Sequence, residues 1–281
     1  MTVTPIPNPV DLYEDINNLT LHYLKWGTKD LNPLLLLHGI TSNAHAWDNL
    51  APRWAQDNWV MALDQRGHGE SDWTKEGYSV TGFASDIYGF SKKLGLAPFD
   101  VVGHSLGSRN LISFAGTHSK LISHLVLSDC GPELPREGAQ TNSRRVASRP
   151  TSFRSFDDAR AYYMEVNPTW TKEQLEHTVK HSLRTNYAGK IVWRHDPELS
   201  WIAGSFGLKE VPHLWEQCAA ITCKTLILHG EKSHVLNTEI ITRMLQVLPN
   251  AEVHHFKDAT HSLPQDHPDE YYQIVQDFLK S

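Results

Sequence analysis

Short apolar runs alternate with amphipathic segments along most of the chain. Six of these runs have the length of a strand, and they lie at residues 34–37, 59–63, 100–102, 125–127, 225–228 and 253–256. Such runs are typical of strands covered on both faces, and their alternation with helices predicts an α/β fold with a doubly wound, mostly parallel sheet. Functional side chains are then expected at the carboxyl ends of the strands.

Two segments show the spacing of helices that pack on this sheet. Between residues 106 and 116, the apolar side chains of Leu106, Leu111 and Ile112 recur at helical intervals. A second amphipathic segment covers residues 269–279. We expect both segments to cover the sheet.

The stretch 133–215 differs from its flanks. It lacks strand-like apolar runs, is rich in arginine and aromatic residues, and carries helix-start signals such as the Asn-Pro-Thr sequence at residues 167–169. We therefore predict a helical cap at 133–215, inserted into one α/β core that is formed by residues 1–132 and 216–281.

The charge of the chain argues against a nucleic-acid partner. The 281 residues carry a formal net charge of -6, with lysine and arginine scattered rather than clustered. A protein that neutralises a phosphate backbone needs a basic stripe, which this sequence lacks. We expect a small-molecule substrate, and the sequence leaves open whether the chain works as a monomer or a homodimer.

Cysteine usage and hydropathy bear on location. The three cysteines form no C-x-x-C pair, which favours free thiols in a reducing compartment, and we expect the cytoplasm. Residues 1–10 have no apolar run of the kind found in secretion signals. The longest apolar stretch, around residues 34–37, is far shorter than the roughly 20 residues that cross a bilayer, so no membrane association is expected.

The strongest chemical signal is the sequence G-H-S-L-G at residues 103–107. It follows an apolar run directly and precedes a helical pattern, which is the context of a nucleophile elbow. In such a turn the small flanking residues avoid a clash, and the helix N-terminus favours negative charge that develops near the serine. Ser105 is therefore predicted to be an exposed nucleophile, although a glycine-rich turn that merely contains serine would give the same letters.

Two further loops follow the first two central strands. The sequence L-H-G-I-T-S-N at residues 37–43 lets the backbone turn toward the site, and the backbone N–H groups of Ile40 and Leu106 are predicted to form an oxyanion hole. The sequence D-Q-R-G-H-G-E-S at residues 64–71 suits a tight, hydrogen-bonded loop with a structural role.

Together these motifs resemble the α/β-hydrolase superfamily across nearly the whole chain. The order is H-G after one strand, D-x-R-G-H-G-x-S after the next, G-H-S-L-G after a third, and a late histidine. The resemblance implies that this histidine, the catalytic base, follows the last strand, which matches His261. His255 and His267 remain alternatives.

The acid of the predicted triad departs from the usual family pattern. Most relatives carry an aspartate after the penultimate strand, where this chain reads H-G-E-K-S-H-V at residues 229–235. Some family members place the acid after the preceding central strand instead, which matches Asp129. A carboxylate there can orient the imidazole and stabilise its charged form, so we predict Asp129 as the acid. Glu231 is the competitor, and a purely structural Asp129 is the other alternative.

A smaller subgroup, which includes 2-(acetamidomethylene)succinate hydrolase, a linear-amide hydrolase, is also similar. The likeness lies in H-G-I-T-S-N, D-Q-R-G-H-G-x-S-D, G-H-S-L-G-x-R-N and a G-E-x-S segment. It implies that Arg145 meets a substrate carboxylate, whereas a solvated arginine face is the alternative. The arginine–tyrosine pair implied further along corresponds to Val166 and Asn167. We also expect Tyr163 and Trp201 of the aromatic-rich cap to contact substrate.

No cofactor or metal is expected. His177 and His181 have helical i, i+4 spacing, but the intervening residues lack the glutamate of an H-E-x-x-H site and no third ligand is evident in the sequence. The leading hypothesis is a serine hydrolase that cleaves a carboxylic ester, lactone or linear amide through an acyl-enzyme. The alternatives are a C–C bond hydrolase, a lyase or transferase using the same site, and a small-molecule receptor with little turnover.

Overall fold

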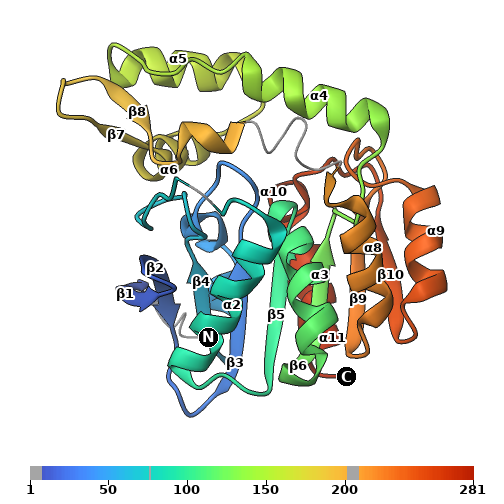
Figure 1. Cartoon of the computed structure of the whole chain (residues 1–281). Coiled ribbons are helices and arrows are strands. Elements are labelled where there is room, and N and C mark those ends of the chain that lie inside the picture. The colour runs from blue at the N-terminus through green and yellow to red at the C-terminus, as the bar shows by residue number, and fades with distance from the viewer. Residues whose placement is uncertain (1–7, 76, 201–208) are drawn as a thin grey trace, which may run out of the picture.

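The chain folds around an eight-stranded sheet, here in a computed structural model that describes residues 8–75, 77–200 and 209–281. The strand order is β1-β2-β4-β3-β5-β6-β9-β10 (Figure 1). Strand β2 is antiparallel to both of its neighbours, and the other pairs are parallel. The strands are β1 Val10–Ile16, β2 Leu19–Trp26, β3 Asn32–Leu37, β4 Asn58–Leu63, β5 Phe99–His104, β6 Ile122–Ser128, β9 Lys224–Gly230 and β10 Ala251–Phe256.

The predicted mostly parallel, doubly wound α/β sheet is confirmed, and the six apolar runs fall inside β3, β4, β5, β6, β9 and β10. The hydrophobic pattern missed β1 and β2. Strand β1 lies at the sheet edge with most of its residues exposed, and β2 interrupts its apolar positions with Thr20, His22 and Lys25. Strand β1 is largely exposed at the edge, so it shows no continuous apolar run. Strand β2 is mostly buried, but its run is broken by the buried polar His22, whose ring hydrogen-bonds Asp64.

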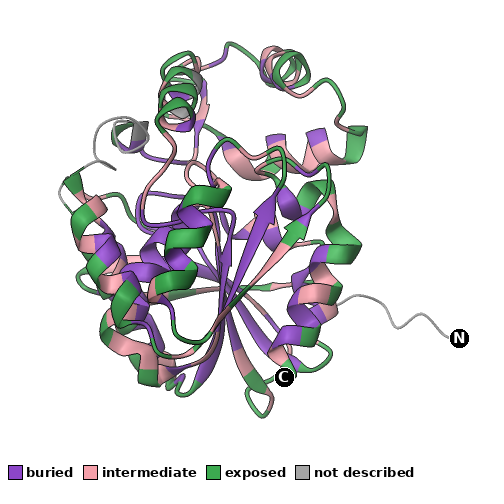
Figure 2. Ribbon diagram, turned by 90° about the vertical axis from the view of Figure 1, so that its right-hand side faces the viewer, coloured by how far each residue is buried: buried purple, intermediate pink, exposed green. Residues whose placement is uncertain are grey.

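Alternating side chains of each central strand enter two separate hydrophobic cores. In β3, Leu35 and Leu37 pack on one side of the sheet, whereas Leu34 and Leu36 pack on the other. Helices α2, α3, α8 and α9 cover the first side, and α1 and α11 cover the second. Figure 2 shows the strands as a buried layer between helices whose outer faces are exposed. This is the arrangement that makes strands read as uninterrupted apolar runs.

The helices of the core begin and end close to the predicted segments. Helix α3 covers the predicted segment 106–116 and α11 the segment 269–279. The core helices are α1 Ala51–Trp54, α2 Val80–Leu94, α3 Leu106–His118, α8 Val211–Ala220, α9 Thr238–Val247, α10 Leu263–Asp266 and α11 Pro268–Leu279, with short 3-10 turns η1 Ala44–Trp47 and η2 Ser119–Leu121.

The described residues 136–200, between β6 and α8, form a segment that lies over one end of the sheet (Figure 1). Its elements are α4 Arg136–Ala147, α5 Phe156–Val166, α6 Lys172–Ser182, β7 Leu183–Thr185, β8 Ile191–Trp193 and η3 Pro197–Ser200. It contacts the loops that follow β3 and β4, since Asn43 donates to the His181 carbonyl at 2.9 Å and Asp196 N–H donates to the Gly67 carbonyl at 2.8 Å. The segment therefore covers the carboxyl ends of the strands, and we call it the cap.

The cap differs in detail from the sequence expectation. It contains the antiparallel pair β7–β8 besides its helices. The predicted helix start at residues 167–169 is wrong, because Asn167 ends α5, and α6 begins after Thr171, whose side chain and that of Gln174 form a capping box. Helix α8 crosses the expected boundary between residues 215 and 216, and its Leu214 and Cys218 pack in the sheet core.

Two properties of the described residues bear on the expected location. None of the helices in these ranges is long and apolar enough to span a bilayer. Cys130, Cys218 and Cys223 are free thiols, and the first two are buried.

Candidate active site

The loops after β3 and β5 meet at the topological switch point of the sheet. Strand β3 pairs with β4 on one side and with β5 on the other, so the connections leave in opposite directions and open a crevice at the carboxyl ends. The loops are in close contact, because a Cβ atom added to Gly39 would lie 3.2 Å from Ser105 Cβ. The sheet topology thus brings the predicted oxyanion loop to the predicted nucleophile.

Ser105 occupies the sharp turn between β5 and α3. It follows His104, the last residue of β5, and Leu106 begins the helix. Its backbone angles, φ 55° and ψ -115°, lie in a region that a non-glycine residue rarely adopts. Such strain is typical of a nucleophile elbow, where it holds the serine hydroxyl away from the backbone and toward the crevice.

Three side chains from distant parts of the sequence form one chain of hydrogen bonds. Ser105 Oγ lies 2.9 Å from His261 Nε2, and His261 Nδ1 lies 2.7 Å from Asp129 Oδ2. Because an ionised carboxylate only accepts hydrogen bonds, the Nδ1–H group must donate to Asp129 and leave Nε2 free to accept from the serine hydroxyl. The imidazole is therefore oriented to remove the serine proton.

Asp129 holds its position at the end of β6 by several contacts. Its backbone is left-handed, with φ 51°, a conformation that aspartate tolerates better than most residues. Its fully buried carboxylate accepts Gly230 N–H at Oδ1, at 3.1 Å, and the Ser233 hydroxyl at Oδ2. These bonds satisfy a buried charge that would otherwise be costly.

The competing acid and the alternative bases have other partners. The exposed Glu231 accepts a hydrogen bond from Asp258 N–H at 3.2 Å. His255 Nδ1 lies 2.9 Å from His229 Nδ1, and His267 Nδ1 lies 3.5 Å from a carboxylate oxygen of Glu270. The structure thus brings Asp129 and His261 to Ser105, and these three alternatives have their partners elsewhere.

Two positioning groups were missed by the sequence reasoning. Ser233 lies in the segment after β9 that lacks the usual aspartate, and its hydroxyl supports the acid at the alternative position. His104, the variable residue of G-x-S-x-G, donates from Nε2 to the His261 carbonyl at 2.9 Å. Burial lowers the pKa of His104 to about 4, so its ring is neutral at pH 7. The only sequence signal for these two groups was the hydroxyl of Ser233, which lies in the segment that lacks the usual aspartate.

The predicted oxyanion-hole residues lie on the two segments that meet at Ser105. Leu106 is the first residue of α3, and Ile40 packs against the small apolar cluster that contains Leu106. The loop that carries Ile40 has Thr41 in a left-handed conformation, and Thr41 Oγ1 accepts a hydrogen bond from Arg149 of the cap at 2.6 Å. The cap therefore holds the loop next to Ile40.

The polar loop after β4 supports the loops around the site through hydrogen bonds. Asp64 accepts Ala44 N–H at 2.6 Å and Glu70 N–H at 2.9 Å, so it fixes the two loops to each other. Arg66 forms a buried ion pair with Asp86. His38 is buried and hydrogen-bonds the Gly39 carbonyl at 2.8 Å. These contacts are those of a scaffold rather than of groups that face a substrate.

The predicted substrate contacts of the cap are described only in part. Tyr163 is buried inside the cap, where its ring stacks on Trp170 and meets Trp193 edge-on. Burial raises the pKa of Tyr163 to about 12. Arg145 belongs to α4, but its side chain lies outside the described part of the structure, as does all of Trp201.

Comparison with known proteins identifies the family. A family model for the alpha/beta hydrolase fold matches residues 32–268, which covers the elbow, the acid and the late histidine. The chain belongs to the α/β-hydrolase fold family. The predicted family membership is thereby confirmed.

Relatives of this α/β-hydrolase include named hydrolases. It is 25% identical over 265 residues to 2-(acetamidomethylene)succinate hydrolase of Mesorhizobium japonicum, covering 94% of this chain and 93% of that protein. It is 28% identical over 270 residues to N-formylmaleamate deformylase of Pseudomonas putida, covering 94% of each. A crystal structure of E-2-(acetamidomethylene)succinate hydrolase superposes with a TM-score of 0.88 at 24% identity, covering 97% of this chain and all of the other. The protein is an α/β-hydrolase enzyme.

Proposed function

We propose that this α/β-hydrolase is a serine hydrolase that cleaves a linear amide, ester or lactone of a small molecule through an acyl-enzyme. The observation that carries the proposal is the hydrogen-bonded chain from Ser105 Oγ through His261 to Asp129. A hydroxyl at a strained elbow, an imidazole that accepts its proton and a buried carboxylate that orients the imidazole are what nucleophilic acyl transfer requires.

The proposed reaction has two halves. His261 Nε2 takes the proton as Ser105 Oγ attacks the substrate carbonyl, and the same proton then goes to the leaving amine or alcohol as the acyl bond breaks. Water, deprotonated by His261, next attacks the acyl-enzyme and releases the carboxylic acid with the free serine. The N–H groups of Ile40 and Leu106 would bind the oxyanion in both steps, and the loss of one such donor typically costs about 2.7 to 4 kcal/mol.

A linear amide is the substrate class that we favour. The names of the two relatives describe compounds with an acetamido and an N-formyl group, both of which are N-acyl groups. Those compounds are also carboxylic acids by name, and Arg149 of the cap contacts Thr41 beside the proposed oxyanion hole. A small N-acyl compound is therefore the first to test, with esters and lactones of matched acyl groups beside it.

Replacement of the nucleophile tests the proposal. Ser105→Ala should lower kcat by at least about 10³-fold on whichever N-acyl amide, ester or lactone the wild type turns over, because no other group in the proposed mechanism attacks the carbonyl. Ser113→Ala, which removes another buried serine of α3, is the matched control and should keep activity. The measurement is steady-state kinetics with product identification by mass spectrometry.

Two results would contradict this function. Full activity of Ser105→Ala would remove the nucleophile, and products without an added water would point to a lyase or transferase. Labelling by a fluorophosphonate probe gives an assay that needs no substrate: the probe should label the wild type and Ser113→Ala but not Ser105→Ala. Tight binding of small molecules without any labelling would instead indicate a receptor.

We also propose a cytoplasmic location. The three free thiols, two of them buried, support a reducing compartment.

A further inference from the structure

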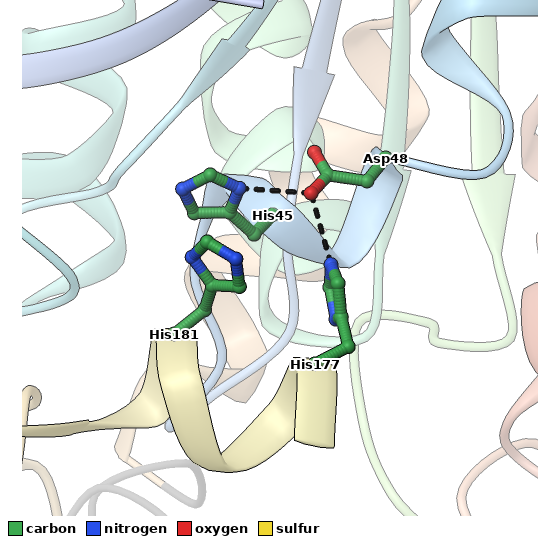
Figure 3. Close-up of side chains that lie close together, drawn as sticks. All are labelled: His45, Asp48, His177 and His181. Carbon is green, nitrogen blue, oxygen red and sulfur yellow. Dashed lines mark hydrogen bonds and ion pairs between the residues drawn. The ribbon is translucent and has the colours of Figure 1, made fainter. Parts of the chain in front are cut away.

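Three histidines and one aspartate gather where the cap meets the core, apart from the serine, histidine and aspartate described above. His45 and Asp48 come from the loop after β3, and His177 and His181 come from α6 of the cap (Figure 3). We call these four residues the His–Asp cluster. One ligand atom from each residue can be chosen so that all four lie within 4.8 Å of one another.

Local geometry aims each pair of side chains in a common direction. His45 lies in the 3-10 turn η1 and Asp48 directly follows it, three residues along, and side chains at this spacing eclipse each other in a 3-10 helix. His177 and His181 are four residues apart on α6 and therefore share one face of that helix. The sequence alone shows the pair His177 and His181. Only the fold brings the second pair, His45 and Asp48, next to it.

The Asp48 carboxylate joins two histidines of the cluster, one from each element (Figure 3). Its Oδ2 atom is 2.9 Å from both His45 Nδ1 and His177 Nε2, and the rings of His45 and His181 lie 3.5 Å apart between centroids. Asp48 Oδ1 is buried and has no hydrogen-bond partner in the described part of the protein. A carboxylate with one unsatisfied buried oxygen and imidazoles on several sides offers more acceptor capacity than the two hydrogen bonds use.

These donors match a transition-metal ion of the zinc class. Imidazole nitrogen binds zinc at about 2.0 to 2.1 Å and carboxylate oxygen at about 2.0 to 2.2 Å, so four tetrahedral ligand atoms lie roughly 3.4 Å apart. The widest spacing in the His–Asp cluster is 4.8 Å. Closing it to the tetrahedral spacing requires ring movements of about 1 Å. Calcium and magnesium, which prefer oxygen ligands, do not fit three imidazoles.

We propose that the His–Asp cluster binds one divalent transition-metal ion, with zinc as the best match, and so clamps α6 of the cap to η1 of the core. Binding replaces the hydrogen bonds from His45 and His177 to Asp48 Oδ2 with metal–nitrogen and metal–oxygen bonds. The ring nitrogen that binds the ion gives up its proton to solvent, and the other ring nitrogen carries the one proton that the metal-bound imidazole retains. Four protein ligands would leave no position for a reacting water, so the ion is structural rather than catalytic.

The surroundings of the cluster support a clamp. Asn43 accepts His45 N–H at 3.0 Å and donates to the His181 carbonyl at 2.9 Å, so one side chain already ties the two ligand-bearing elements together. The same loop carries Ile40 three residues before Asn43. An ion that fixes α6 on this loop would therefore also fix the cap over the proposed active site.

Direct metal binding by the chelator-treated full-length protein tests this proposal. Equilibrium dialysis with Zn²⁺ should give one ion per chain, and Co²⁺ should give the intense visible absorption of a four-coordinate ion with nitrogen and oxygen ligands. His177→Gln and His181→Gln should each weaken Zn²⁺ binding at least about tenfold. Saturating Zn²⁺ should raise Tm in the wild type but not in the double variant, because only the wild type binds the ion in its folded state.

A control variant tests whether histidines outside the His–Asp cluster account for the binding of Zn²⁺. His255 and His229 form a second pair of neighbouring imidazoles on β10 and β9, so His255→Gln removes such a pair outside the cluster and should bind Zn²⁺ like the wild type. The proposal is overturned if the wild type binds no stoichiometric Zn²⁺, or if the His177→Gln, His181→Gln double variant binds it equally well. The Co²⁺ spectrum of the wild type decides the point even where a variant fails to fold.

Discussion

Asp129 combines a left-handed backbone, a fully buried carboxylate and a hydrogen bond to His261. A buried charge is tolerated only where hydrogen bonds satisfy it, and here the donors come from Gly230, Ser233 and His261. The sequence suggested Asp129 because the segment after β9 has no aspartate. That Ser233 of the same segment donates to Asp129 became evident only from the structure.

Replacing each carboxylate in turn distinguishes the two candidates for the triad acid. Asp129→Asn keeps the shape but removes the acceptor that holds the Nδ1–H tautomer of His261, and we expect kcat to fall by about 10⁴-fold. Glu231→Gln is the matched control and should keep kcat within about threefold, since Glu231 bonds Asp258 N–H. Steady-state kinetics on the same substrate decides between them, and the reverse pattern would assign the acid to Glu231.

At the scale of elements, the active-site crevice depends on how closely α3 approaches β3. A Cβ atom added to Gly107 would lie 2.5 Å from the Leu37 carbonyl oxygen at the end of β3. Such a distance cannot be accommodated without moving the helix or the strand. Ser105 and Ile40 sit at the two sides of this contact, so the glycine that ends the G-x-S-x-G motif sets their separation.

A methyl group at this contact should therefore affect stability and catalysis together. We expect Gly107→Ala to lower the free energy of unfolding by about 1 to 3 kcal/mol through overpacking and to reduce kcat at least about tenfold. Gly95→Ala is the matched control, since Gly95 has φ +71° with open space around it and ends α2 away from the site. It should cost about 1 kcal/mol and leave kcat unchanged. Urea unfolding and kinetics on both variants measure the two effects; equal kcat values for them would contradict the prediction.

At the scale of the whole molecule, several histidines are held neutral in the interior. Burial is the first cause of the lowered pKa in each of these residues: His38, His68, His104, His195 and His229. The pKa of His195 falls to about 3 and that of His104 to about 4. The unfolded chain therefore binds more protons than the folded protein between the ordinary histidine pKa and about pH 4. His22, Asp100 and Glu210, whose pKa values are raised, act in the opposite direction.

The fold should accordingly lose stability as the medium becomes acidic. Stability rises with pH wherever the unfolded state binds more protons, so the free energy of unfolding should fall as pH drops from about 6.5 toward 4. Each group whose pKa is lowered by two units contributes about 2.7 kcal/mol over the full window. Urea unfolding in the presence of a chelator at pH 7.0, 5.5 and 4.5 measures this loss, and His195→Gln should make it shallower. Equal or greater stability at pH 4.5 would refute the explanation.

The sequence by itself determined the features that are encoded locally. Apolar runs gave the six strands that are buried on both faces, because such strands need no polar positions. The turn at Ser105 was visible because its glycines, preceding strand and following helix are contiguous in the chain. The family order of motifs added His261 and Asp129, and the structure places both within hydrogen-bonding distance of their partners.

Only the tertiary structure decided which distant groups touch. The pairing of β2 with β4 and the donation from Ser233 to Asp129 depend on neighbours that lie far away in sequence. The His–Asp cluster is the clearest case, since the sequence showed His177 and His181 without a third ligand, and the approach of α6 to η1 supplied His45 and Asp48. The hydrophobic pattern of a segment reflects which of its faces are buried, whereas a contact between two segments depends on how the whole chain packs.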